Sequence, residues 1–177
     1  HEYGGTADSR IYAGASTTIR AWALSRVRDR AGVGTGNAIT LTYANDAQYG
    51  AYTNGSHRIA SIDYPTTATG AGPFYRVEFA YSARPASDVP TGYLAGHPVR
   101  DPYQLDRITV LAVGTATPIK SYSLGYETAT VSGRLRLVSV QECGATTCLE
   151  PTTIAYQNGA SGWQPAVNTQ VVVSSAK

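Results

Sequence analysis

The sequence has 177 residues, with 14 Lys or Arg and 12 Asp or Glu, which gives a formal net charge of +2. This length suits one domain with its own core, and the near-neutral charge argues against a nucleic-acid-binding protein. The sequence contains neither an apolar run of the roughly 18 residues that a membrane-spanning helix needs nor a charged-then-apolar leader. Because the chain starts at His1 without Met, we expect a piece of a longer protein.

The first half of the chain predicts a weak strand at 10–13 and then a hairpin at 22–43. In its second arm Ile39, Leu41 and Tyr43 alternate with threonines, which is typical of a strand with one buried face. The Gly-rich segment 29–37 allows the chain to reverse. The first arm also contains good helix formers, so a two-turn helix remains an alternative to a strand there. The unit of strand, polar Gly turn and strand ending in Tyr recurs along the chain.

Further strands are predicted at 58–64, where Pro65 should end the strand, and at 75–81. In the second of these Tyr75, Val77, Phe79 and Tyr81 share one face, so Phe79 is expected in the core. The long segment 84–101 carries three prolines and predicts a functional loop or a packed flap. Later strands are predicted at 105–113, 119–127, 134–141, 152–157 and 171–173.

Short strands separated by Gly or Pro turns predict an all-β fold, with residues 1–177 forming a single domain. Since sequential strands usually lie side by side, we expect an antiparallel meander that forms a twisted sheet, a sandwich or a partly closed barrel.

The two cysteines, Cys143 and Cys148, lie on either side of a short turn that contains Gly144. They could form a local disulfide in an exported protein, remain free thiols in a cytosolic one, or supply half of a metal site. The metal site is disfavoured because it needs two further ligands and the sequence has no second Cys pair.

No motif for catalysis, phosphate binding or calcium binding is present, and the three histidines and the carboxylates are scattered. We therefore predict no catalytic residue, no cofactor site and no metal site; a hydrolase built from distant Asp and His residues is the least favoured alternative. Aromatic residues in predicted loops support a second hypothesis, a carbohydrate-binding module. Its ring-stacking candidates are Tyr93, Tyr103 and Trp163, although such rings also commonly fold back as loop anchors.

Nine segments follow one another in a characteristic order: YGGTADSRI at 3–11, WALSRVRDRAGVGTGNAITLTY at 22–43, RIASIDY at 58–64, YRVEFAYSARP at 75–85, TGYLAGHPV at 91–99, LDRITV at 105–110, YSLGYE at 122–127, RLRLVSVQEC at 134–143 and PTTIAY at 151–156. In this order they resemble the SpvB-like and insecticidal Tc-toxin B-subunit proteins that carry RHS (YD) repeats. The resemblance spans nearly the whole chain, but the turn in the first hairpin is lengthened to DRAGVGTGN.

The resemblance implies an exported, β-rich shell that encloses a C-terminal toxic effector and lies near propeller repeats. An ADP-ribosyltransferase found in some members sits elsewhere, so no functional residue is carried over. We thus expect a non-enzymatic scaffold segment, secreted or on the bacterial cell surface, whose partners are flanking shell or propeller regions of its parent chain. Export favours the Cys143–Cys148 disulfide. The uncharged, β-branched segment 169–173 predicts an exposed edge that self-associates or folds back onto the sheet.

Overall fold

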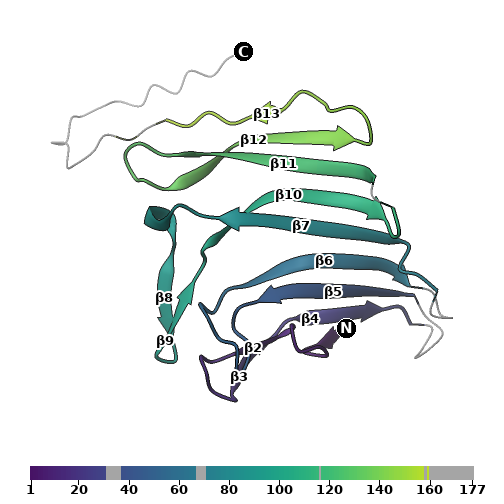
Figure 1. Ribbon diagram of the computed structural model, residues 1–177, viewed down its shortest axis with the longest axis vertical. Helices are drawn as coiled ribbons and strands as arrows, with labels where there is room; N and C mark the ends of the chain where they lie inside the picture. Colours follow the sequence, from purple (N-terminus) through teal and green to yellow (C-terminus); the bar gives the residue numbers. More distant parts are fainter. Residues whose placement is uncertain (31–36, 67–70, 116, 158, 160–177) are drawn as a thin grey trace, which may run out of the picture.

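We describe residues 1–30, 37–66, 71–115, 117–157 and 159 in a computed structural model of the chain. They form a nine-stranded sheet in the order β1-β4-β5-β6-β7-β10-β11-β12-β13, and every neighbouring pair is antiparallel (Figure 1). The strands are β1 (Glu2–Tyr3), β4 (Leu24–Arg28), β5 (Ala38–Asn45), β6 (His57–Thr66), β7 (Tyr75–Ala83), β10 (Tyr103–Ala112), β11 (Pro118–Thr128), β12 (Leu135–Gly144) and β13 (Thr152–Thr153).

Two small hairpins lie at one end of this sheet (Figure 1). One pairs β2 (Arg10–Tyr12) with β3 (Ile19–Trp22), and the other pairs β8 (Thr91–Leu94) with β9 (His97–Arg100). The second hairpin follows a 3-10 turn, η1 (Ala86–Asp88), so the segment expected to be a loop has regular structure of its own. Its tip, Ala95-Gly96, takes positive φ angles of 50° and 79°, which lets a short turn reverse the chain.

The predicted all-β antiparallel fold is confirmed. The first arm of the hairpin is not a helix: Trp22 ends β3, and after Ala23 the chain enters β4. The turn expected at 29–37 and the strand expected at 171–173 lie wholly or partly outside the described residues. Two boundaries were clearly wrong: the strand expected at 152–157 ends at Thr153, and β6 continues through Pro65 to Thr66. Proline lacks only the N–H donor, and the Pro65 carbonyl still accepts a hydrogen bond from the backbone N–H of Phe74 at 3.4 Å.

The two faces of the large sheet differ in chemistry. Residues that lie opposite each other on paired strands share a face, so the pairing connects apolar side chains into rows across the sheet. One row contains Leu41, Ile62, Val77 and Val110, and the next contains Phe79, Ile108 and Tyr122. Polar rows alternate with these on the other face, where one row contains Thr40, Asp63 and Arg76.

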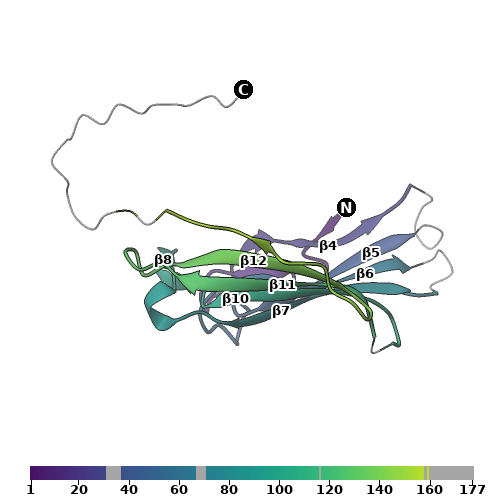
Figure 2. The same ribbon diagram turned by 90° about the horizontal axis from the view of Figure 1, so that it is seen from above.

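The apolar face lacks a second layer among the described residues, and the large sheet is a single layer when seen from above (Figure 2). Only Ala38 and Ala47 are buried apolar residues in this part of the chain. Phe79, expected in the core, is only half-buried. The guanidinium of Arg58 lies over the neighbouring Tyr81, 5.6 Å from its ring centroid, but no described strand is layered on the face that Phe79 shares with Tyr81.

The sheet is open, with two-residue strands β1 and β13 at its edges. Of the three architectures considered from the sequence, the described residues therefore form the twisted sheet, and they form neither the sandwich nor the partly closed barrel. None of their helical segments is long and apolar enough to cross a membrane.

Candidate functional site

A groove lies where the two small hairpins meet the start of β6. It has a volume of about 640 Å³, and its lining includes Arg20 from β3, His57 from β6, Tyr93 from β8 and Arg100 from β9. Arg20 is held in place by a 3.3 Å hydrogen bond from Nη2 to the Gly55 carbonyl. Tyr93 is 76% exposed, so its ring is open to a ligand.

The three stacking candidates do not gather at this groove. Tyr93 lines it, whereas the ring of Tyr103 is covered by the guanidinium of Arg58, whose Cζ lies 3.6 Å from the ring centroid. Arg58 is itself fixed by an ion pair with Asp46 at 3.0 Å. Tyr103 is the first residue of a strand and not of a loop, and one face of its ring is therefore already occupied by a cation–π contact. Trp163 lies outside the described residues.

His57 lines the groove from the start of β6. Its ring stacks on Tyr43 with the centroids 4.4 Å apart, and Nε2 lies 3.1 Å from the Asp8 carbonyl. Burial lowers the pKa of His57 below its ordinary value, partly offset by the interaction with Asp8. The neutral imidazole is thus the favoured form. Within the described ranges no group of three or more His, Cys, Asp or Glu could hold a metal ion.

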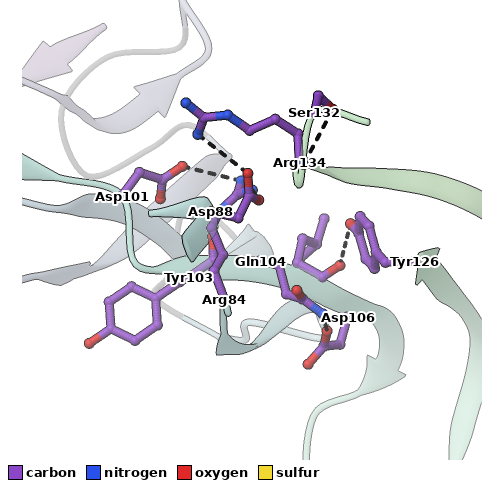
Figure 3. A network of polar contacts seen from close by, with 10 residues as sticks. Arg84, Asp88, Asp101, Tyr103, Gln104, Asp106, Tyr126, Ser132 and Arg134 are labelled. Atoms are coloured by element: carbon purple, nitrogen blue, oxygen red, sulfur yellow. Dashed lines mark hydrogen bonds and ion pairs between the residues drawn. The ribbon is translucent and has the colours of Figure 1, made fainter. Parts of the chain in front are cut away.

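A second polar cluster centres on Asp88, which is 3% exposed at the end of η1 (Figure 3). Its carboxylate accepts from Arg84 Nη1 at 3.1 Å and from Arg134 Nη1 at 3.4 Å. Arg84 also pairs with Asp101 at 3.4 Å. Arg134 lies just before β12, so the cluster joins the segment that carries β8 and β9 to the turn between β11 and β12.

Electrostatics keep Asp88 ionised. Burial by itself raises the pKa of Asp88, but hydrogen bonds from the Leu135 backbone, Arg84 and Arg134 outweigh it, so the pKa is lowered below its ordinary value. A carboxylate held this way has no proton to donate near neutral pH, so it suits a structural clamp better than general acid catalysis. Sequence reasoning missed the cluster, although the i,i+4 spacing of Arg84 and Asp88 is a visible signal.

Cys143 and Cys148 are joined by a disulfide in the turn after β12, with the Sγ atoms 2.04 Å apart. The turn is also closed by a 2.7 Å hydrogen bond from the Gly144 N–H to the Thr147 carbonyl. With both sulfurs in this bond, neither is available as a thiolate ligand for the half-site weighed from the sequence.

No protein-family model matches the sequence, and comparison with curated proteins also finds no match. Solved structures do match. The crystal structure of TcdB2-TccC3-Cdc42 aligns with 89% of this chain at a TM-score of 0.64 and 14% identity. The Photorhabdus luminescens Tc holotoxin pore aligns with 88% of it at a TM-score of 0.63 and 15% identity. The N-terminal domain of the effector protein SpvB from Salmonella typhimurium strain LT2 aligns with 80% at a TM-score of 0.57 and 15% identity.

These alignments cover 10% of each of the two Tc-toxin chains and 57% of the SpvB chain. At such identities the likeness is one of fold, and the fold is the one that the sequence resemblance implied.

Proposed function

We propose, from the fold that this chain shares with parts of Tc toxins and SpvB, that it is a non-catalytic structural segment of a larger exported protein of that kind, in which it helps to form a shell around an effector. The observation that carries this proposal is the uncovered apolar face: of the described apolar residues, only Ala38 and Ala47 are buried. A sheet in this state has most of its burial still to gain from neighbouring structure.

The occupant of that face is the flanking part of the same parent chain. The matching Tc-toxin chains are about ten times longer than the part that this chain aligns with, which supplies ample sequence for a second layer. The opposite face has less need of such cover, because it is polar and carries ion pairs: Arg76 binds Asp63 through two hydrogen bonds, of 2.6 and 3.0 Å, and Arg136 lies 2.6 Å from Glu127. Such charged pairs are compatible with solvent.

A dye that binds exposed apolar surface tests this assignment. We expect the 177-residue chain to enhance ANS fluorescence strongly, and a version extended by its natural flanking sequence to do so several-fold less per molecule. Tyr122→Lys on the apolar face should reduce the signal of the short chain, whereas the matched control Ser121→Lys on the polar face should not. A short chain that is folded by circular dichroism and does not bind the dye would contradict the proposal.

Carbohydrate binding at the groove is a second candidate function, favoured by one observation. Tyr93 exposes 76% of its surface beside Arg20 and Arg100, which is an arrangement of ring and donors that suits a sugar. We expect Tyr93→Ala to abolish signals on a glycan array. The control is Tyr49→Ala, a tyrosine 57% exposed that does not line the groove. An unmodified chain that binds no glycan on the array would exclude this candidate.

A further inference from the structure

Four tyrosines make the same long-range hydrogen bond. Three of them lie two residues before the end of the second strand of a hairpin, and the fourth lies three residues after β13. Each hydroxyl donates to the backbone carbonyl of the first or third residue of the hairpin's first strand. The pairs are Tyr43 to Leu24 at 2.7 Å, Tyr81 to Ile59 at 2.9 Å, Tyr126 to Leu105 at 2.7 Å and Tyr156 to Leu137 at 2.8 Å. Figure 3 shows Tyr126 making this contact.

Each acceptor residue also marks a β-bulge. The residue after it, namely Ser25, Ala60, Asp106 or Val138, has no partner on the preceding strand, and the pairing shifts by one residue there. The acceptor itself lies opposite the tyrosine of the preceding strand, as Ile59 does to Tyr43 and Leu105 to Tyr81. Leu24 stands in the same relation to Tyr3. A bulge locally breaks the hydrogen-bond ladder, and the tyrosine hydroxyl bonds the backbone at that break.

The register within the four hairpins is identical, although their connections differ in length. The acceptor and tyrosine are 19, 22, 21 and 19 residues apart. Nevertheless, the second residue after the acceptor always pairs with the third residue before the tyrosine. These pairs are Arg26 with Thr40, Ser61 with Glu78, Arg107 with Ser123, and Ser139 with Thr153.

The sequence carries the same pattern in all four hairpins. The acceptor is Leu or Ile, and the position three residues later is Val or Ile. A large apolar residue stands two positions before the tyrosine, at Leu41, Phe79, Leu124 and Ile154, and a small one directly before it, at Thr42, Ala80, Gly125 and Ala155. A Cβ added at Gly125 would clash with Ser139 Oγ, so the smallest residue is the one that fits there.

We propose that Tyr43, Tyr81, Tyr126 and Tyr156 are register-setting residues of a tandem hairpin repeat, and that each fixes the place of the bulge between the first strand of its hairpin and the preceding strand. A slip of one residue would turn the apolar rows to the polar face. In a sheet with an uncovered apolar face, packing alone selects against that slip only weakly. A slip that removes the bulge also moves the acceptor carbonyl away from the tyrosine hydroxyl, so the shifted pairing loses this hydrogen bond and its stabilising free energy.

Cross-linking of paired cysteines tests the proposal, because it measures register instead of stability alone. In a Cys143→Ser, Cys148→Ser background, Ala80→Cys with Arg107→Cys reports the bulged register, since these residues lie opposite each other. Ala80→Cys with Asp106→Cys reports the slipped register. We expect Tyr126→Phe to raise the ratio of slipped to bulged cross-link about three- to tenfold, as the loss of one hydrogen bond would.

The matched control is Tyr64→Phe, which removes the hydroxyl of a half-buried sheet tyrosine that has no hydrogen-bond partner among the described residues. A second site repeats the test, with Tyr81→Phe read through Thr42→Cys paired with Ser61→Cys or with Ala60→Cys. Ratios that change at neither site, or that change equally with Tyr64→Phe, would overturn the proposal. A parallel fall of both cross-links would overturn it too, because the tyrosine would then hold the hairpin without choosing its register.

Discussion

Truncation of Phe79 measures how much of the apolar face is covered. Phe79 lies opposite Ile108 and between Val77 and Tyr81 on its own strand, so its ring has lateral neighbours but no described layer above it. A fully buried Phe→Ala change costs about 3–5 kcal/mol, and a ring packed only from the side should lose about half of that. We therefore expect Phe79→Ala to reduce the free energy of unfolding of the 177-residue chain by about 1.5–2.5 kcal/mol.

Urea denaturation followed by circular dichroism measures this loss, with unchanged slope as the sign that the folded state is intact. In a version extended by the natural flanking sequence, the same substitution should cost the full 3–5 kcal/mol, because the ring is then buried. Glu78→Ala, on the opposite face, is the matched control and should cost similar amounts in both chains. A full-size loss in the short chain would refute the reasoning, since it would mean that the face is already covered.

Three further predictions concern named side chains. Intact-mass analysis after alkylation should find Cys143 and Cys148 unlabelled without reductant and both labelled after reduction. Two reactive thiols in oxidised material would exclude the disulfide. Burial raises the pKa of Tyr43, Tyr81 and Tyr126. The stability that these tyrosines contribute should therefore be complete below about pH 10 and lost as the pH rises through their raised pKa values. In an alkaline titration, tyrosinate absorbance and the unfolded fraction should rise together. Because the pKa of Asp88 is lowered, its contribution to stability should be complete above about pH 4 and lost as the pH falls through its folded-state pKa. Asp88→Asn should therefore weaken the dependence of the urea midpoint on pH below about pH 4. An unchanged dependence would show that other carboxylates cause the loss of stability in acid.

Alternation along single strands predicted the sheet well, because period-2 patterns such as Tyr75 to Tyr81 are local. The recurring strand that ends in Tyr was also visible in the sequence. Its hydrogen bond was not, since the acceptor carbonyl lies about 20 residues earlier and backbone groups leave no trace in residue type. The burial of Phe79 was overestimated for a related reason: alternation shows which face is apolar, and what covers that face depends on other segments.

The groove and the Asp88 cluster show the same limit. Arg20, His57 and Tyr93 come from three different hairpin arms, and only the placement of the two small sheets brings them together. The two arginines on Asp88 lie 4 and 46 residues away from it, so only one of the two partners could be predicted from local spacing.

The open sheet also determines how the chain can come apart. In a globular core every element touches many others, so the whole molecule unfolds as a unit, whereas each strand of the large sheet is hydrogen-bonded only to its immediate neighbours. The stability of the sheet is then a sum of the interactions between adjacent strands, as it is between adjacent units in repeat proteins. Opening begins at the rims, where β1 and β13 have two residues each, and travels inward one strand at a time toward β7 and β10. We accordingly expect amide exchange in the isolated chain to be slowest at the middle of the sheet and fastest at both rims.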